Sequence, residues 1–104
     1  MTAPRRRLLL TATAAVQVEA IDRWWRSERT AAPLLFRDEL ARCLERIQVS
    51  PGAGILYPYA ALPGLRRVLL RATGYHVYFR GGTDSLVVVH AVWHGARGSG
   101  PQLQ

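Results

Sequence analysis

The first half of the chain repeats apolar residues at the spacing of an α-helix. In residues 14–27, Val18, Ile21 and Trp25 stand at i, i+3 and i+7, which predicts one apolar stripe along an amphipathic helix. Thr13 is the expected N-cap of this helix, because a threonine hydroxyl accepts a hydrogen bond from the first turn.

A second helical pattern covers residues 30–49. Its apolar positions recur at i, i+4, i+8 and i+11, and they are Phe36, Leu40, Leu44 and Ile47. Thr30 is the expected N-cap, and Pro33 is placed in the first turn, where a missing N–H costs little. Because the connection between the two helices is short, we expect them to fold back on each other as a helical hairpin.

Adjacent tryptophans stand near the end of the first helical pattern. Neighbouring residues of a helix point about 100° apart around its axis, so Trp24 and Trp25 cannot share one environment. We expect one of them to pack on a sheet. The other is expected at the edge of the core or at an interface with a partner, where Trp is enriched.

Strand-like segments stand on both sides of the helical pair. The first is Arg6–Thr11, and after a Gly- and Pro-punctuated loop over residues 51–64 come Leu65–Arg71, Tyr75–Arg80 and Leu86–Trp93. The order β-α-α-β-β-β predicts an α+β fold, with a small, twisted, mainly antiparallel sheet and the helical hairpin packed on one face. We expect residues 1–97 to form a single domain and residues 98–104 to form a loosely ordered tail.

The first twenty residues allow a second interpretation. Three arginines, an apolar stretch over residues 8–16 and small residues after it resemble a secretory signal peptide. The apolar stretch is short, and Thr11 and Thr13 interrupt it. We favour a strand that feeds the first helix, because the helical pattern runs straight through any cleavage point.

The positive charge is concentrated in one part of the sequence. All 14 basic residues are Arg, and the net charge is +7. Residues 12–50 contain equal numbers of Arg and acidic residues, so the whole excess falls in the first strand and the C-terminal half. A focused basic surface favours an acidic partner, either a nucleic acid or an acidic protein. The alternative is a general solubilising charge.

The alternation of side chains along the expected strands collects polar and basic residues on one face. Val77 and Phe79 point to the apolar face, which should meet the helices. The opposite face is expected to carry Arg67, Arg71, His76, Tyr78, Arg80, His90 and His94, with Arg97 just past its edge. Basic residues with interleaved aromatics favour contact with phosphates. His90 lies amid valines, so it can also be interpreted as a core histidine. The alternative for the set is an ordinary solvated face of an antiparallel sheet.

Metal and cofactor chemistry find little support in the sequence. One cysteine, Cys43, cannot form an internal disulfide, which fits a reducing cytoplasm. Cys43 lies in the second helical pattern and is expected to pack in the core. The three histidines and the cysteine do not have metal-ligand spacing, and no phosphate-binding loop is present. We therefore expect no metal and no cofactor.

Five motifs along the chain resemble the RelE/ParE superfamily of toxins from type II toxin–antitoxin pairs. Their order and spacing carry the resemblance, which covers residues 5 to 97. The motifs are Ala-Pro-Leu-Leu-Phe-Arg-Asp-Glu-Leu at 32–40, Ser-Pro-Gly-Ala-Gly at 50–54, Gly-Leu-Arg-Arg at 64–67, Gly-Tyr-His-Val-Tyr-Phe at 74–79, and Val-Trp-His-Gly-Ala-Arg at 92–97.

The resemblance implies a fold and a partner. The fold is a small twisted sheet with an α-hairpin on one side, in agreement with the pattern above. The implied protein is a growth-inhibiting cytoplasmic toxin with no membrane contact, neutralised by an antitoxin whose acidic tail wraps around it. ParE-like members poison DNA gyrase without a hydrolytic site, whereas RelE-like members cut messenger RNA in the ribosome.

The ribonuclease pattern of the family matches this sequence only in part. Arg67 stands where a strand Lys is expected, but a second expected cation is Leu69. His76 replaces an Arg after Gly-Tyr, Arg97 matches the Arg after the last strand, and no Tyr stands in the tail. His76 or His94 can in principle act as the acid or base, because imidazole titrates near neutrality.

We therefore expect a ParE-like toxin that acts on gyrase. A metal-independent ribonuclease that uses Arg67, His76, His94 and Arg97 is the first alternative, and a non-toxic interaction module is the second. In the gyrase interpretation, the residues expected to contact the target or a nucleic acid are Arg67, Arg71, His76, Tyr78, Arg80 and Arg97.

Overall fold

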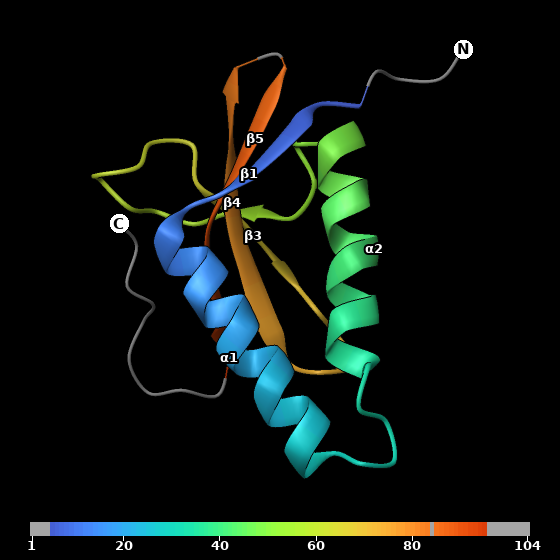
Figure 1. Cartoon of the computed structure of the whole chain (residues 1–104). Coiled ribbons are helices and arrows are strands. Elements are labelled where there is room, and N and C mark those ends of the chain that lie inside the picture. The colour runs from blue at the N-terminus through green and yellow to red at the C-terminus, as the bar shows by residue number, and fades with distance from the viewer. Residues whose placement is uncertain (1–4, 84, 96–104) are drawn as a thin grey trace.

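The chain folds as a two-layer α+β structure, with one sheet and two helices on one of its faces. The computed structural model describes residues 5–83 and 85–95. The elements along the chain are β1 (Arg7–Leu10), α1 (Ala12–Glu28), α2 (Leu35–Val49), β2 (Ile55–Leu56), β3 (Arg66–Leu69), β4 (Tyr75–Thr83) and β5 (Leu86–His94). Both helices cover the same side of the sheet, and they diverge from the connection that joins them (Figure 1). The expected fold class and element order are thereby confirmed, with β2 as a short strand that the sequence did not predict.

The sheet has the strand order β1-β5-β4-β3-β2. β1 pairs with β5 in parallel, and every other pairing is antiparallel. β1 therefore lies at one edge beside the last strand, although the two are farthest apart in the sequence. A parallel pair needs a crossover connection, and the helical pair with the following strands supplies it.

The main core lies between the sheet and the apolar stripes of the helices. Phe36, Leu40, Cys43 and Ile47 of α2 are buried at helical spacing, and Trp25 is the buried tryptophan of α1. From the sheet, the residues buried in this cluster are Leu70, Val77, Phe79, Val87, Val89 and Val92. The expected stripes and the expected apolar face of β4 are confirmed.

Both helices begin at residues other than the expected ones. Thr11 is the N-cap of α1, and its hydroxyl oxygen accepts a hydrogen bond from the Ala14 N–H at 3.1 Å. The Thr13 cap was therefore wrong by two residues. α2 begins only at Leu35, after turns that include Thr30 and Pro33, and no side chain caps it. These turns replace the expected first turn of the second helix, so the connection between the helices is longer than predicted.

A β-bulge interrupts the pairing of β4 with β5. Tyr78 is opposite Ala91 while the next residue, Phe79, is opposite Val89, so His90 has no residue opposite it. An extra residue in one strand reverses the facing of everything beyond it. Residues 87 and 89 therefore face the helices, as does residue 92 after the bulge, although strict alternation would place Val92 on the same face as His90 and His94.

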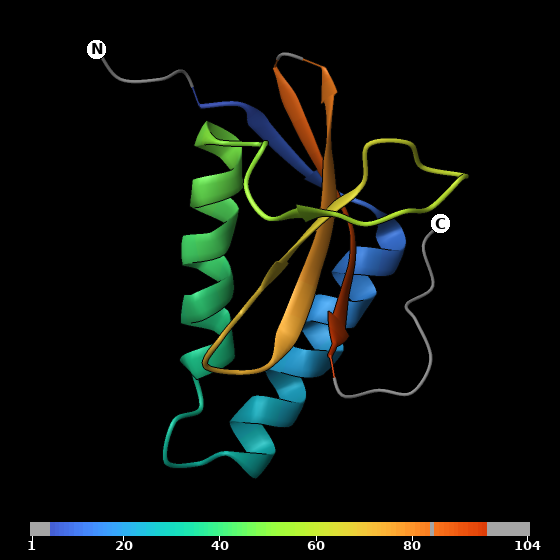
Figure 2. The same cartoon turned by 180° about the vertical axis from the view of Figure 1, so that it is seen from behind.

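A second, smaller cluster lies on the sheet face that points away from the helices. We call this the far face, and its residues are Arg67, Leu69, His76, Tyr78, Arg80, Val88, Ala91 and Trp93. Leu65, Tyr78 and Ala91 are buried there, with Tyr57, Leu62 and Trp93 packed against them. Figure 2 shows the segment after β2 crossing in front of the sheet on this side. The loop over residues 51–64 thus covers part of a face that the sequence left open.

Candidate functional site

The far face carries a continuous line of rings and one guanidinium group. Arg67 on β3 places its guanidinium carbon 5.3 Å from the ring centre of Tyr57. Tyr57 stands edge-on to Tyr78 at 5.0 Å, and Tyr78 stands edge-on to His76 at 6.2 Å. The arrangement follows from register, because Arg67 is opposite Tyr78 in the β3–β4 pairing. A cation stacked on an aromatic ring is held in place and still presents N–H donors outward.

Tyr78 departs from its expected role. It was expected on an open surface, but only 3% of it is exposed, because Tyr57 and Leu65 cover it. Its ring supports the line described above and does not form the outer surface. The sequence does contain a signal for this cover, because the loop has apolar residues, Tyr57 and Leu62, between its glycines and prolines.

His94 lies on the helix side of the sheet, and its expected position on the far face was wrong. Its ring stands edge-on to that of Tyr75 at 4.9 Å. The bulge at His90 is the cause, because it reverses the facing of the last residues of β5. Gly74 has φ +85, and a Cβ built on it would lie 2.9 Å from His94 Nε2, so glycine is required next to this ring.

The remaining predicted residues are dispersed. Arg71 lies in the exposed turn after β3 and lines a shallow pocket with Glu39 and Arg42 of α2, so it does not join the far face. Arg80 is on the far face and donates a hydrogen bond to the Pro63 carbonyl at 3.5 Å. Arg97 lies outside the described residues.

Burial of His90 is nearly complete. It is 6% exposed, and neither ring nitrogen has a hydrogen-bond partner among the described residues. Burial lowers the pKa of His90 below 6.5, and the nearby Arg80 lowers it further. The interpretation as a core histidine is supported over that as a surface ligand, although its polar atoms are left unsatisfied.

His76 is the titratable group at the end of the ring line. Burial is the largest cause that lowers the pKa of His76 below 6.5. The positive charge of Arg67 lowers it further, and so does His94. A lowered pKa keeps the imidazole neutral near pH 7. His76 is therefore an acceptor or a base in this site, not a fixed cation.

The formal charge of the strands is positive. None of the five strands contains Asp or Glu, and the far face has Arg67 and Arg80. Some arginines are used internally, as Arg6 donates to the Gln48 and Val49 carbonyls at the end of α2, and Arg66 donates to the Gly54 carbonyl. The free positive surface is therefore smaller than the net charge suggests.

The described residues contain neither a metal site nor a membrane-spanning helix. Among residues 5–83 and 85–95, no group of three or more His, Cys, Asp or Glu is placed to hold a metal ion. Within the same residues, neither helix is long and apolar enough to cross a bilayer.

Comparison with known proteins agrees with the fold. A family model described as the ParE toxin of the type II toxin–antitoxin system parDE matches residues 8–98. One similar solved structure is titled "Chromosomal ParDE TA system from P. aeruginosa"; it has 19% sequence identity and a TM-score of 0.65, and the match covers 86% of this chain and 96% of that one. At that identity the structure supports the fold alone. No curated protein matches the sequence. The family match spans most of the chain, and the chain therefore belongs to the ParE toxin family of type II toxin–antitoxin systems.

Proposed function

We propose that this toxin inhibits growth in the cytoplasm by binding DNA gyrase, and that it has no hydrolytic site of its own. Its family supports the proposal, and so does one observation on the site. The described side chains that a ribonuclease would need are divided between two faces of the sheet: Arg67 and His76 lie on the far face, and His94 lies on the helix side.

RNA cleavage demands several groups around one phosphate. A base must reach the ribose hydroxyl, cations must stabilise the charged phosphorane, and an acid must protonate the leaving oxygen. Around Arg67, the next far-face residue of β3 is Leu69 and the neighbouring tyrosine, Tyr78, is buried. A surface with one stacked cation and neutral rings suits binding of a partner better than phosphate chemistry.

The test is induction of this chain alone in a bacterial host, with transcript ends and gyrase-linked DNA breaks mapped in the same cells. We expect DNA breaks with intact transcripts. Transcript ends clustered within translated codons would instead identify a ribonuclease. Growth that is unaffected by induction would favour the non-toxic interaction module.

Two variants separate binding from catalysis on the far face. His76→Gln keeps a polar side chain but cannot act as a general base, and we expect it to remain toxic. Arg67→Glu reverses the stacked charge, and we expect gyrase affinity to fall by roughly tenfold or more, because like-charge or unpaired contacts at an interface are costly. Arg23→Glu is the matched control, because Arg23 is exposed on α1 and, among the described residues, its ion pair is with Glu19 on the same helix.

A further inference from the structure

A small hollow lies at the edge of the fold, between α2 and the end of β3. Its volume is about 250 Å³, which is below the roughly 300–1,000 Å³ of pockets that take small-molecule ligands. α2 forms one wall, and the end of β3 with the turn after it forms the other. The lining consists of Glu39, Arg42, Cys43, Arg46, Val68, Leu69, Leu70 and Arg71. We call it the arginine hollow, and its size suits one anionic group better than a whole nucleotide.

Three exposed arginines reach the arginine hollow from its two walls. Arg42 and Arg46 stand one turn apart on α2, and Arg71 stands across from them in the turn after β3. None of the three forms an ion pair with a described residue. Like charges four residues apart on a helix repel each other and destabilise it. The placement of Arg42 and Arg46 therefore costs the free protein some stability, which a bound anion returns.

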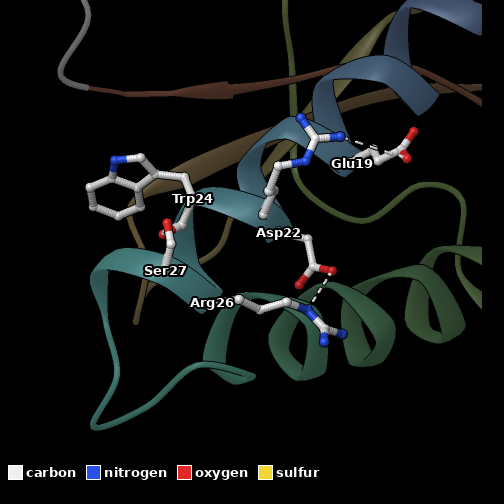
Figure 3. Close-up of polar contacts among 6 residues, drawn as sticks. Glu19, Asp22, Trp24, Arg26 and Ser27 are labelled. Carbon is white, nitrogen blue, oxygen red and sulfur yellow. Dashed lines mark hydrogen bonds and ion pairs between the residues drawn. The ribbon is translucent and has the colours of Figure 1, made fainter.

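The first helix differs, because two of its arginines are neutralised within the helix. Arg23 pairs with Glu19 at 3.8 Å, and Arg26 pairs with Asp22 at 3.1 Å. Figure 3 shows the Asp22 carboxylate turned toward Arg26. The arginine hollow thus gathers positive charge that the described part of the fold leaves unpaired.

The acid in the lining, Glu39, is already engaged by the turn between β3 and β4. Its two oxygens accept the N–H groups of Ala72 and Thr73 and the hydroxyl of Thr73. Three arginines against one carboxylate give the lining a formal charge of +2. Cys43 and Leu70, which also line the hollow, are buried and apolar. Because apolar walls beside charges of one sign focus their field, the hollow favours an anion.

The lining also indicates which kind of anion fits. Guanidinium groups match phosphate oxygens, to which they donate paired hydrogen bonds. No aromatic residue is among the described residues that line the hollow, so it offers no ring on which an unpaired base can stack, as sites for single strands do. Contacts to phosphates alone are those that a protein makes with the backbone of a duplex, whose bases remain stacked.

We propose that the arginine hollow binds the phosphate backbone of duplex DNA, with Arg42 and Arg46 on neighbouring phosphates and Arg71 reaching the same strand from the opposite wall. The inference goes beyond contact with gyrase itself, and it rests on the proposed function only in choosing DNA over another duplex nucleic acid. Phosphate contacts position a protein without reading the sequence. The toxin therefore holds any duplex at this edge, on the side of α2 away from the far-face loop.

The test is the affinity of the purified full-length toxin for a fluorescently labelled duplex of about 20 base pairs, measured by anisotropy between about 50 and 200 mM salt. Each phosphate contact contributes about 0.9 to the slope of log affinity against log salt. We expect Arg42→Gln, Arg46→Gln and Arg71→Gln each to reduce that slope by about one and to weaken binding by about three- to tenfold at the lowest salt. A duplex of different sequence should bind within about twofold of the first.

Arg23→Gln is the matched control, because it removes the same charge from an exposed arginine that pairs with Glu19. We expect it to leave the slope unchanged. Thermal unfolding gives a second comparison. Arg46→Gln should be at least as stable as the wild type, because it relieves the repulsion with Arg42, so its loss of affinity cannot come from unfolding.

Each outcome bears on the inference separately from the proposed function. Wild-type slopes in all three hollow variants overturn the inference, and so does tighter binding of a single-stranded RNA of the same length. If the wild type causes gyrase-linked breaks but does not bind the duplex at the lowest salt, the proposed function stands and the inference fails. If the wild type causes no such breaks but the hollow variants lose duplex affinity, the proposed function fails and the inference stands.

Discussion

Glu39 of α2 holds the backbone and the side chain of Thr73 in the turn between β3 and β4. Its Oε1 accepts hydrogen bonds from the Thr73 N–H at 3.1 Å and from the Thr73 hydroxyl at 2.7 Å. Its Oε2 accepts the Ala72 N–H at 2.7 Å. One carboxylate therefore satisfies three donors and ties the second helix to the turn between β3 and β4.

Removal of this carboxylate should destabilise the fold measurably. Glu39→Ala leaves the nearly buried Thr73 donors without a partner, and we expect the free energy of unfolding to fall by about 1–3 kcal/mol. Urea denaturation followed by circular dichroism measures it. Glu45→Ala, an exposed acid of the same helix, is the control and should change stability by less than about 0.5 kcal/mol. Equal effects of the two substitutions would contradict the assigned role of Glu39.

Thr11 joins the start of α1 to the bulge in β5. Its hydroxyl oxygen accepts from the Ala14 N–H at 3.1 Å, and the hydroxyl donates to the His90 carbonyl at 3.3 Å. Thr11→Ala removes both bonds, and we expect a loss of about 1–2 kcal/mol in the free energy of unfolding. Thr11→Ser keeps the hydroxyl and should recover most of that loss. A serine variant as unstable as the alanine variant would show that packing of the threonine methyl group, not capping, is what matters.

The sequence predicts the helical layer well because its signals there are redundant. In α2, burial at positions 36, 40 and 47 follows directly from helical spacing, and every charged residue of the helix stands at another position. Tyr75–Arg80 alternates cleanly, so the facing of Val77 and Phe79 could also be derived. In each case the apolar residues follow a single period, which is 3.6 residues in α2 and two residues in β4.

In β5 the facing of the side chains could not be predicted from the sequence pattern. Its sequence is a nearly unbroken apolar run, so alternation gives no indication of a bulge at His90. The bulge is stabilised from a distant helix, because Gln17 of α1 accepts the Val92 N–H at 2.8 Å. That contact joins residues 75 positions apart and leaves no local signal. The expected site therefore gathered His94 with His76 on one face, whereas the bulge places them on opposite faces.

Cys43 should be chemically unreactive in the folded protein. Burial raises its pKa from 9.0 to about 11, against a smaller opposing effect of Arg46. The reactive species is the thiolate, and a rise of about two pKa units lowers its fraction near pH 8 by roughly 100-fold. We expect alkylation by iodoacetamide to be slow in buffer and fast in urea, measured by mass spectrometry. Rapid modification of the folded protein would show that this part of α2 opens readily.

The two histidines with lowered pKa values predict that the fold weakens in mild acid. His90 is shifted by burial and then by Arg80, and His76 by burial, then Arg67, then His94. Because both groups bind protons more readily in the unfolded chain, the unfolded state gains more protons as the pH falls below 6.5. Their stabilising contribution is therefore complete above that pH and is lost progressively as the pH falls toward the folded-state pKa values.

Urea unfolding at pH 7.5 and at pH 5.5 measures this loss of stability. His90→Leu should reduce the difference between the two pH values, because Leu is of similar size, does not titrate and leaves no buried nitrogen unsatisfied. His76→Gln removes the other contribution, so the two variants separate the groups. The double variant should show the smallest difference. If the wild type is equally stable at both pH values, then neither imidazole is held neutral by the fold, and the bulge at His90 must open to solvent when the ring becomes protonated.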